Sequence, residues 1–251
     1  FEDIGVLGVG ITALYITDLE KRTSATSESE GNFSVVDLAL SFAWAKEVTK
    51  DLSLGANLKG IYESIDNVRA YGLTMDVGLL GKTSIDTNID LLGKIKIERL
   101  NYGVVLQNVG FSMKFIDKAY FLPLTLKCGI SFTQFVKNLY FSTDLIWKVL
   151  DNRLGFNFGV EYLYLDLLYG RFGYKINDND LGFLAGLTVG FGLKLDDYGI
   201  DYAFVPYGDL GVSHRISLNV KFGRTLQEEE EILKKMETKL KEREKTLIDK
   251  Y

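Results

Sequence analysis

The chain has 251 residues, of which 25% are charged, and its formal net charge is -5 at a sequence pI of about 5.1. This acidic balance argues against a nucleic-acid partner, since such proteins concentrate basic side chains on one surface. A single cysteine, Cys128, excludes an internal disulfide, and a single histidine, His214, excludes a metal site built from several histidines. No run of about 18 apolar residues occurs, so the sequence predicts no transmembrane helix.

Alternation of apolar and polar residues predicts β-strands along the first part of the chain, because side chains of a strand point to opposite faces in turn. Residues 20–32 are polar and lack a large apolar anchor, which predicts a long exposed loop. Residues 82–98 show no clear period, and we expect a longer connection there with a short helix or strand. The predicted strands of this part are residues 5–19, 33–46, 52–64 and 71–79.

The same alternation continues to residue 222 and gives about twelve strands in all. Most of them have ten or more residues. Strands of soluble proteins usually run about 5–6 residues, whereas a strand tilted across a bilayer needs about 9–11. The length of the strands therefore favours a protein that crosses a membrane. The predicted strands of this part are residues 99–108, 122–133, 139–149, 154–164, 166–176, 182–194, 198–205 and 213–222.

The connections between the strands differ in length at the two ends of the predicted sheet. Long connections follow Leu19, Asn108, Ile176 and Val205, and tight ones lie near Lys50, Phe135, Tyr164 and Asp196. Outer-membrane barrels have this asymmetry, with long external loops and short periplasmic turns. We therefore predict an all-β fold, an antiparallel transmembrane β-barrel with its apolar face toward lipid. The alternative is a soluble β-sandwich whose apolar faces pack together, which would have to place all these long strands in one core.

Charged residues on the polar faces of the strands are the candidate functional residues. A lysine or arginine facing lipid at mid-depth costs about 2–4 kcal/mol, so we expect these side chains to face the lumen. Two roles stay open for them: a mutually paired network that fills the interior, or a polar lining of a pore. Glu161 and Arg171 flank one short turn and Asp201 and Arg215 flank one loop, so both couples are candidate ion pairs. The predicted lumen-lining residues are Asp37, Lys59, Glu63, Asp76, Asp144, Glu161, Arg171, Asp201 and Arg215.

Nothing in the pattern indicates catalysis. Cys128 falls on the apolar face of its strand, and His214 lies at the edge of a loop, so no nucleophile has a base beside it. The carboxylates of Asp144 and Glu161 have no spacing that singles them out for acid–base chemistry. We predict that the protein is not an enzyme and that it binds neither a cofactor nor a metal.

Residues 224–251 differ from the rest of the chain and form a separate predicted segment. They contain no glycine or proline, and pairs such as Glu231 with Lys235 have the spacing of helical ion pairs. A coiled-coil helix needs a seam of two apolar rows, or arms, that repeat every seven residues, and here the second arm is poor in apolar residues. Three forms therefore stay open: a solvated single helix, a coiled coil that assembles a dimer or trimer, and a rigid tether. The apolar arm of the seam consists of Leu226, Leu233, Met236, Leu240 and Leu247.

Several stretches resemble the PorV/PorQ family of outer-membrane proteins, which is related to the FadL-type long-chain fatty acid transporters. The most specific are IDYAFVPYGDLGVSHRISLNVKFG at residues 200–223 and FSVVDLALSFAWAKEVTKDLSLGANLKGIYESID at residues 33–66. GVEYLYLDLLYGRFGYKIND at residues 159–178 is fairly specific too, whereas GVVLQNVG and LPLTLKCGISF agree more loosely. The resemblance implies a barrel of about 14 strands with an N-terminal segment in the lumen. It therefore implies that two strands and this plug are missing from the present sequence.

The expected domains are the barrel at residues 1–223 and a periplasmic helical extension at residues 224–251. We expect a bacterial outer-membrane protein with outer-membrane lipid as its surroundings, a hydrophobic small-molecule ligand and a homo-oligomer, a dimer or trimer, formed through the tail. The expected function is passive transport of small or hydrophobic solutes. The alternative is a structural anchor or a secretion-accessory barrel whose tail tethers partners. The charged tail departs from the pattern of the family member that serves type IX secretion.

Overall fold

The computed structural model describes residues 4–22, 28–89, 93–133, 138–176, 182–195 and 197–222, together with Met236. Twelve strands form one antiparallel sheet in which each strand pairs with its neighbours in chain order. A separate hairpin, β6 and β7, and two 3-10 turns, η1 (Phe183–Gly186) and η2 (Gly208–Leu210), lie in the connections. The strands are β1 (Val6–Glu20), β2 (Asn32–Thr49), β3 (Leu52–Ile65), β4 (Val68–Ile89), β5 (Gly93–Gly110), β6 (Met113–Phe115), β7 (Lys118–Tyr120), β8 (Thr125–Thr133), β9 (Leu139–Lys148), β10 (Arg153–Tyr164), β11 (Leu168–Ile176), β12 (Leu187–Leu195), β13 (Tyr198–Pro206) and β14 (Val212–Val220).

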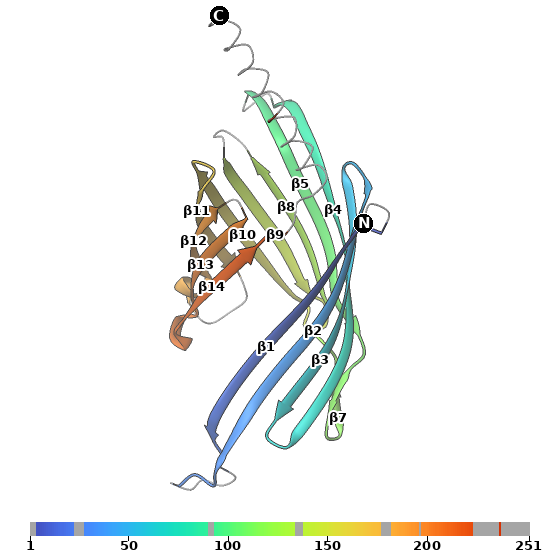
Figure 1. Cartoon of the computed structure of the whole chain (residues 1–251), viewed down its shortest axis with the longest axis vertical. Coiled ribbons are helices and arrows are strands. Elements are labelled where there is room, and N and C mark those ends of the chain that lie inside the picture. The colour runs from blue at the N-terminus through green and yellow to red at the C-terminus, as the bar shows by residue number, and fades with distance from the viewer. Residues whose placement is uncertain are drawn as a thin grey trace, which may run out of the picture.

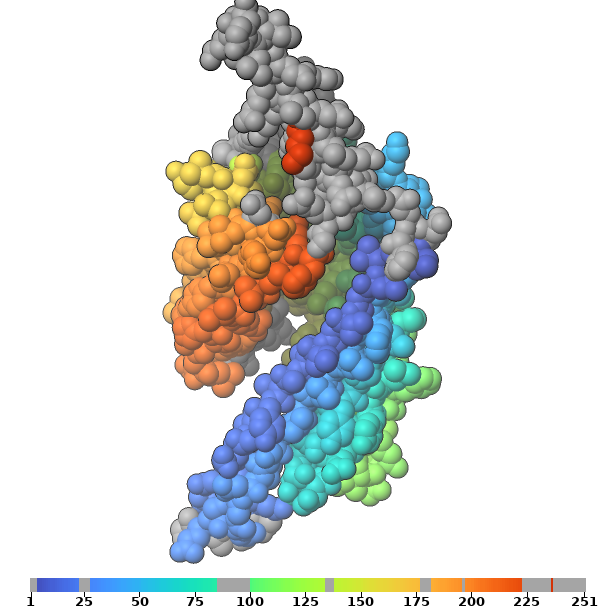
Figure 2. Space-filling view, viewed as in Figure 1, coloured from blue at the N-terminus to red at the C-terminus, as the bar shows by residue number. Residues whose placement is uncertain are grey.

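The sheet curves into an incomplete cylinder with a concave inner face (Figure 1). Its two edge strands, β1 and β14, are not paired with each other, so the described sheet is open along one side. Figure 2 shows this opening between the strip formed by β1 and the body formed by β13 and β14. The even number of antiparallel strands means that β1 and β14 run in opposite directions, as two neighbouring strands of a closed barrel do.

The predicted count of twelve strands in an antiparallel all-β sheet is confirmed. The strands of this sheet have nine to 22 residues, so each is long enough to cross a bilayer when tilted. The predicted connection at residues 82–98 is wrong, because β4 continues to Ile89 and β5 begins at Gly93. Backbone pairing with a neighbouring strand maintains the extended conformation here even though the sequence lacks a clear period.

Two further differences concern the connections at one end of the sheet. Residues 183–186 form the turn η1, so the strand predicted from residue 182 begins only at Leu187. The long connection after β5 contains the hairpin of β6 and β7, which the sequence pattern did not indicate. Met113 of this hairpin is buried and packs over Gly72 of β4, where any side chain would collide with the thioether. The hairpin is therefore held against the end of the sheet.

The apolar side chains share one face of the sheet, and that face is exposed. One row of cross-strand neighbours runs through Leu54, Leu79, Val104, Cys128 and Leu145. The neighbouring rows on the same face contain Leu40, Phe42, Tyr102, Phe156 and Phe172, all of them exposed.

Among the described residues only Ala70, Met113 and Val205 are buried apolar side chains, and no second large sheet covers the apolar face. The sandwich alternative is therefore wrong, because it requires these faces to pack together.

The two tryptophans lie on the exposed apolar face of the sheet. Trp44 belongs to the part of β2 that leads to the tight turn before β3, and Trp147 is next to the last residue of β9. A row of cross-strand partners connects the two indoles through Ala56, Val77, Leu106 and Leu126.

The segment predicted as a helical extension, residues 224–251, lies outside the described residues except for Met236. Met236 is in a helical conformation, and its side chain is exposed. The predicted seam of Leu226, Leu233, Leu240 and Leu247, and the coiled coil that depends on it, stay predictions.

Candidate functional site

All nine charged residues predicted from the alternation lie on the concave, polar face of the sheet. Direct cross-strand pairs include Asp37 with Glu63 and Glu161 with Arg171. Lys127 of β8 is a further charged residue of the same face, since it pairs across the strands with Val105 and Ile146 in a row next to Asp144. The sequence contained the signal for it, because Lys127 alternates with Leu126 and Cys128. We name this surface the inner face.

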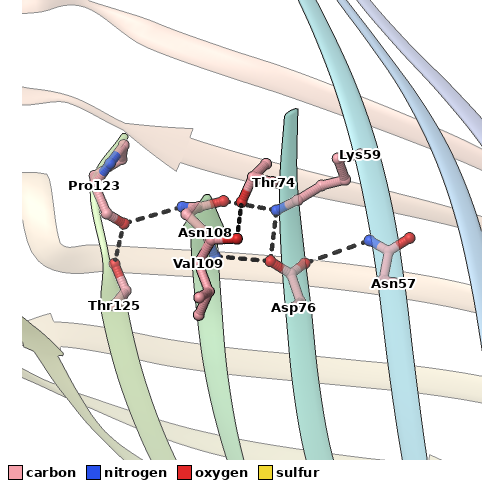
Figure 3. A network of polar contacts seen from close by, with 8 residues as sticks. All are labelled: Asn57, Lys59, Thr74, Asp76, Asn108, Val109, Pro123 and Thr125. Atoms are coloured by element: carbon pink, nitrogen blue, oxygen red, sulfur yellow. Dashed lines mark hydrogen bonds and ion pairs between the residues drawn. The ribbon is translucent and has the colours of Figure 1, made fainter. Parts of the chain in front are cut away.

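One group of inner-face side chains surrounds a β-bulge and is named the bulge cluster: Asn57, Lys59, Asp76 and Asn108. Lys59 makes an ion pair with Asp76 at 2.8 Å and donates a hydrogen bond to Oδ1 of Asn108 at 2.7 Å. Asn57 donates to the second carboxylate oxygen of Asp76 at 3.3 Å. Figure 3 shows how these residues from β3, β4 and β5 converge on the Asp76 carboxylate. Asp76 is only 8% exposed, so it requires these partners.

The bulge itself explains why Asp76 occupies this position. The pairing of β4 with β5 shifts by one residue between Met75 and Val77, and Asn108 adopts a left-handed backbone with φ of 61°. This leaves the N–H of Asn108 without a ladder partner, and it donates instead to the Asp76 carboxylate at 2.8 Å. Asparagine tolerates the left-handed conformation better than most residues. The bulge cluster is thus a structural network that fixes the bend of β5.

A second group, the arginine cluster, consists of Glu161, Arg171, Asp201 and Asn219. Arg171 donates to Glu161 at 2.6 Å and also makes an ion pair with Asp201, which lies two strands away on β13. Asn219 donates to the other oxygen of Asp201 at 3.1 Å. Arg171 can reach across β12 because that strand presents glycine at Gly190 and Gly192 on this face.

The predicted pair of Glu161 and Arg171 is confirmed, but the predicted pair of Asp201 and Arg215 is wrong. Asp201 is bound by Arg171 and Asn219 instead, and Arg215 donates a hydrogen bond to the hydroxyl of Tyr207 at 2.9 Å. The physical reason is the register: Arg215 lies opposite Ala203, and Asp201 lies opposite Ser217. Sequence proximity across the loop therefore does not determine the partner.

Replacing Arg171 with glutamine should lower the free energy of unfolding by about 1–2 kcal/mol, because two carboxylates lose a charged donor while staying partly hydrated. Urea titration of the protein in lipid vesicles measures this loss. Replacing Arg215 with glutamine is the matched control, and it should cost less, since only one bond to a neutral hydroxyl is lost. Equal costs for the two variants would contradict the assignment of Arg171 as the centre of the cluster.

Several charged side chains of the inner face stay without a partner of opposite sign. Asp37 and Glu63 face one another as like charges across β2 and β3, an arrangement that is destabilising in a sheet. Lys127 and Asp144 make no hydrogen bond or ion pair with any part of the chain that the structure describes. The inner face therefore combines two ion-paired clusters with free charges of both signs.

The inner face of the described strands is hollowed in at least two places. The larger, of about 700 Å³, lies over β2 to β5, β8 and β9, and Asn57, Asn101, Lys127 and Asp144 contribute to its wall. The second, of about 580 Å³, is lined by Glu161, Arg171, Asp201 and Arg215, among other residues. The two hollows share Ser131 and Ser142, so they adjoin one another.

The floor of the larger hollow is built from small residues on four successive strands: Gly55, Gly78, Gly103 and Gly129. Side chains at these positions would fill the space, and at Gly78 an added Cβ would already crowd Val105. The hollow therefore exists because these glycines have no side chains, and not because neighbouring strands separate. In the described residues no helix is long and apolar enough to cross a membrane, and no cluster of ligands for a metal ion occurs.

No family model and no curated protein matches the sequence, so the PorV/PorQ and FadL-type resemblance stays a prediction. Among solved structures, a triple mutant of Rhodopseudomonas blastica porin aligns with a TM-score of 0.36 at 8% identity, covering 86% of this chain and 91% of the porin. Another mutant of Rh. blastica porin gives a TM-score of 0.35 with the same identity and coverage. A structure described as "asymmetric conductivity of engineered proteins" gives 0.34 at 9% identity. Values this low carry no argument about function.

Proposed function

We propose that the protein spans a bacterial outer membrane as a barrel-forming β-sheet and provides a passive pathway for small solutes along its inner face. The observation that carries the proposal is the division of the sheet into an exposed apolar face and a hollowed polar face. Soluble monomers rarely expose a continuous apolar patch larger than a few hundred Å². A band that runs across twelve strands is far larger, and lipid is the surrounding that accommodates it.

Backbone hydrogen bonding supports the same placement. A strand within a bilayer must pair on both sides, because no water is available to its N–H and C=O groups. The ten inner strands of the sheet fulfil this requirement, and only β1 and β14 have a free edge. The working form in the membrane is therefore expected to cover these two edges.

The inner face supports passage rather than a filled interior. A barrel plugged by its own side chains needs large residues at these positions, but the floor of the larger hollow presents glycines. The charged side chains of the bulge cluster and of the arginine cluster are bound to one another along the wall, so they do not block the hollow. The charges, amides and hydroxyls that stand between the apolar parts of the lining favour polar solutes over the hydrophobic solutes that the FadL-type resemblance implies.

Swelling of proteoliposomes in iso-osmotic solutions tests the proposal. The purified protein, reconstituted in vesicles, should admit small sugars and glycerol and should exclude solutes as they become larger. Vesicles without protein provide the control. Impermeability to every small polar solute, or uptake of fatty acids alone, would contradict the proposed function. The alternative role as an anchor with residues 224–251 as a tether stays a prediction that deletion of these residues can test.

A further inference from the structure

The larger hollow of the inner face contains two free charges of opposite sign. Lys127 of β8 and Asp144 of β9 both contribute to its wall, and neither has a hydrogen bond or an ion pair with the described residues. In the two clusters described above, Lys59 is bound by Asp76, and Arg171 by two carboxylates. Lys127 and Asp144 instead present free charges of both signs to the same hollow.

The register determines how the two side chains lie relative to each other. Asp144 is directly opposite Gly129, whereas Lys127 is opposite Ile146, so the two charged residues occupy diagonal positions. Diagonal positions of an antiparallel pair are about 7–8 Å apart at the backbone. No ion pair joins the two side chains across this diagonal, so both charged groups stay available to a small ligand.

Gly129 is the residue that makes this arrangement possible. An added Cβ at Gly129 would overlap Oδ1 of Asp144, so the carboxylate lies across the backbone of β8. It is thereby directed over the glycine floor, toward the strand that carries Lys127. A larger residue at position 129 would displace the carboxylate from the hollow.

We propose that this hollow binds zwitterionic small solutes of the α-amino acid class, with Lys127 holding the carboxylate and Asp144 holding the ammonium group. The inference rests on the proposed function, because it names the class of solute that the pathway favours. An anion would be attracted by Lys127 and repelled by Asp144, and a cation the reverse. A molecule that contains both charges satisfies both side chains at once, and charge-assisted hydrogen bonds are the strongest of the available contacts.

The neutral part of the wall fits the same class of ligand. Asn101, Gln107, Ser131 and Ser142 contribute amides and hydroxyls around the free charges. Asn101 already donates to Ser131 at 3.3 Å, which positions that hydroxyl at the wall. These groups can bind polar side chains of different size, so the two charges determine the class of solute and the neutral groups tolerate its variation.

Uptake of L-alanine and of glycerol by proteoliposomes containing the full chain tests this inference. Alanine uptake should saturate, whereas glycerol uptake should rise linearly with concentration. Replacing Lys127 with glutamine, or Asp144 with asparagine, should each raise the half-saturating concentration of alanine about tenfold, which corresponds to the loss of one charged contact. Glycerol uptake by both variants should equal that of the original protein.

The double variant Lys127→Asp with Asp144→Lys provides the sharpest control, because a zwitterion can bind to the exchanged charges in the reverse orientation. Saturation should return in this variant. Lys114→Gln on β6 and Asp151→Asn in the turn after β9 remove one charge each outside the hollow, and both should leave alanine uptake unchanged. Alanine uptake that does not saturate, or that is the same in all variants, would overturn the inference.

The uptake experiment distinguishes a failure of the proposed function from a failure of this inference. Vesicles that admit neither alanine nor glycerol would contradict a pathway altogether. In that case titration calorimetry of alanine with the detergent-solubilised protein still decides the question of binding. Heat of binding that disappears in the Lys127→Gln and Asp144→Asn variants would support the site, and no heat with the original protein would overturn it.

Discussion

Replacing Leu40 with arginine is expected to lower the free energy of unfolding in a bilayer by about 2–4 kcal/mol. Leu40 lies in β2 on the exposed apolar face, opposite Ile11 of β1 and Gly60 of β3. A guanidinium at this position must leave water and enter the hydrocarbon region, or draw the headgroups toward it. Reversible urea unfolding in lipid vesicles, followed by tryptophan fluorescence, measures the loss.

The adjacent position provides the matched control. Ala39 precedes Leu40 on the same strand and lies on the inner face, opposite Thr12 and Ile61. Arginine at position 39 keeps its charge in the hydrated interior, so its cost should stay below about 1 kcal/mol. The same cost for both arginine variants would mean that the two faces of the sheet meet the same solvent, which contradicts the assignment of the apolar face to lipid.

Replacing Asp76 with alanine is expected to destabilise the protein by about 3 kcal/mol, because breaking a buried ion pair leaves the other charge uncompensated. Lys59 would keep only its bond to Asn108, and the N–H of Asn108 in the bulge would lose its acceptor. The lysine and aspartate side chains are 18% and 12% exposed, so water replaces the lost carboxylate poorly. Asparagine at position 76 should cost less, since its amide oxygen can still accept from that N–H.

Glu47 and Lys82 provide the comparison for this experiment. Their ion pair of 3.7 Å joins side chains that are 69% and 53% exposed. Replacing Glu47 with glutamine should change the free energy of unfolding by less than about 0.5 kcal/mol, as exposed ion pairs contribute little. A cost at Asp76 no larger than that at Glu47 would show that the bulge does not depend on the carboxylate.

The fold was largely predictable from sequence because the two faces of each strand meet different surroundings. Alternation alone identified most strands and assigned all nine charged residues to one face. It failed at residues 82–98, where β4 and β5 pair with each other although neither shows a clear period. It also missed β6 and β7, since a three-residue strand is too short for a period to be recognised.

The side-chain partners on the inner face were less predictable, because they depend on register and on glycine. Arg171 bonds to Asp201 across β12 only because Gly190 and Gly192 lie between them. The alternation assigns Arg215 to the same face but cannot indicate that it faces Ala203 rather than Asp201. In the same way, the bulge at Asn108 brings Asp76 and Lys59 together with a third strand. The bulge is a one-residue shift of register, and the alternation of apolar and polar residues does not reveal such a shift.

Site-directed spin labelling along β2 tests the central claim, that the sheet spans a membrane with its apolar face in lipid and its polar face in water. Single cysteines at positions 38 to 43 are labelled in a Cys128→Ala background, and collisions with oxygen and with a water-soluble nickel complex are measured in vesicles. Labels replacing Leu38, Leu40 and Phe42 should meet oxygen, and those replacing Ala39, Ser41 and Ala43 should meet nickel. Equal exposure to nickel at all six positions would contradict the account.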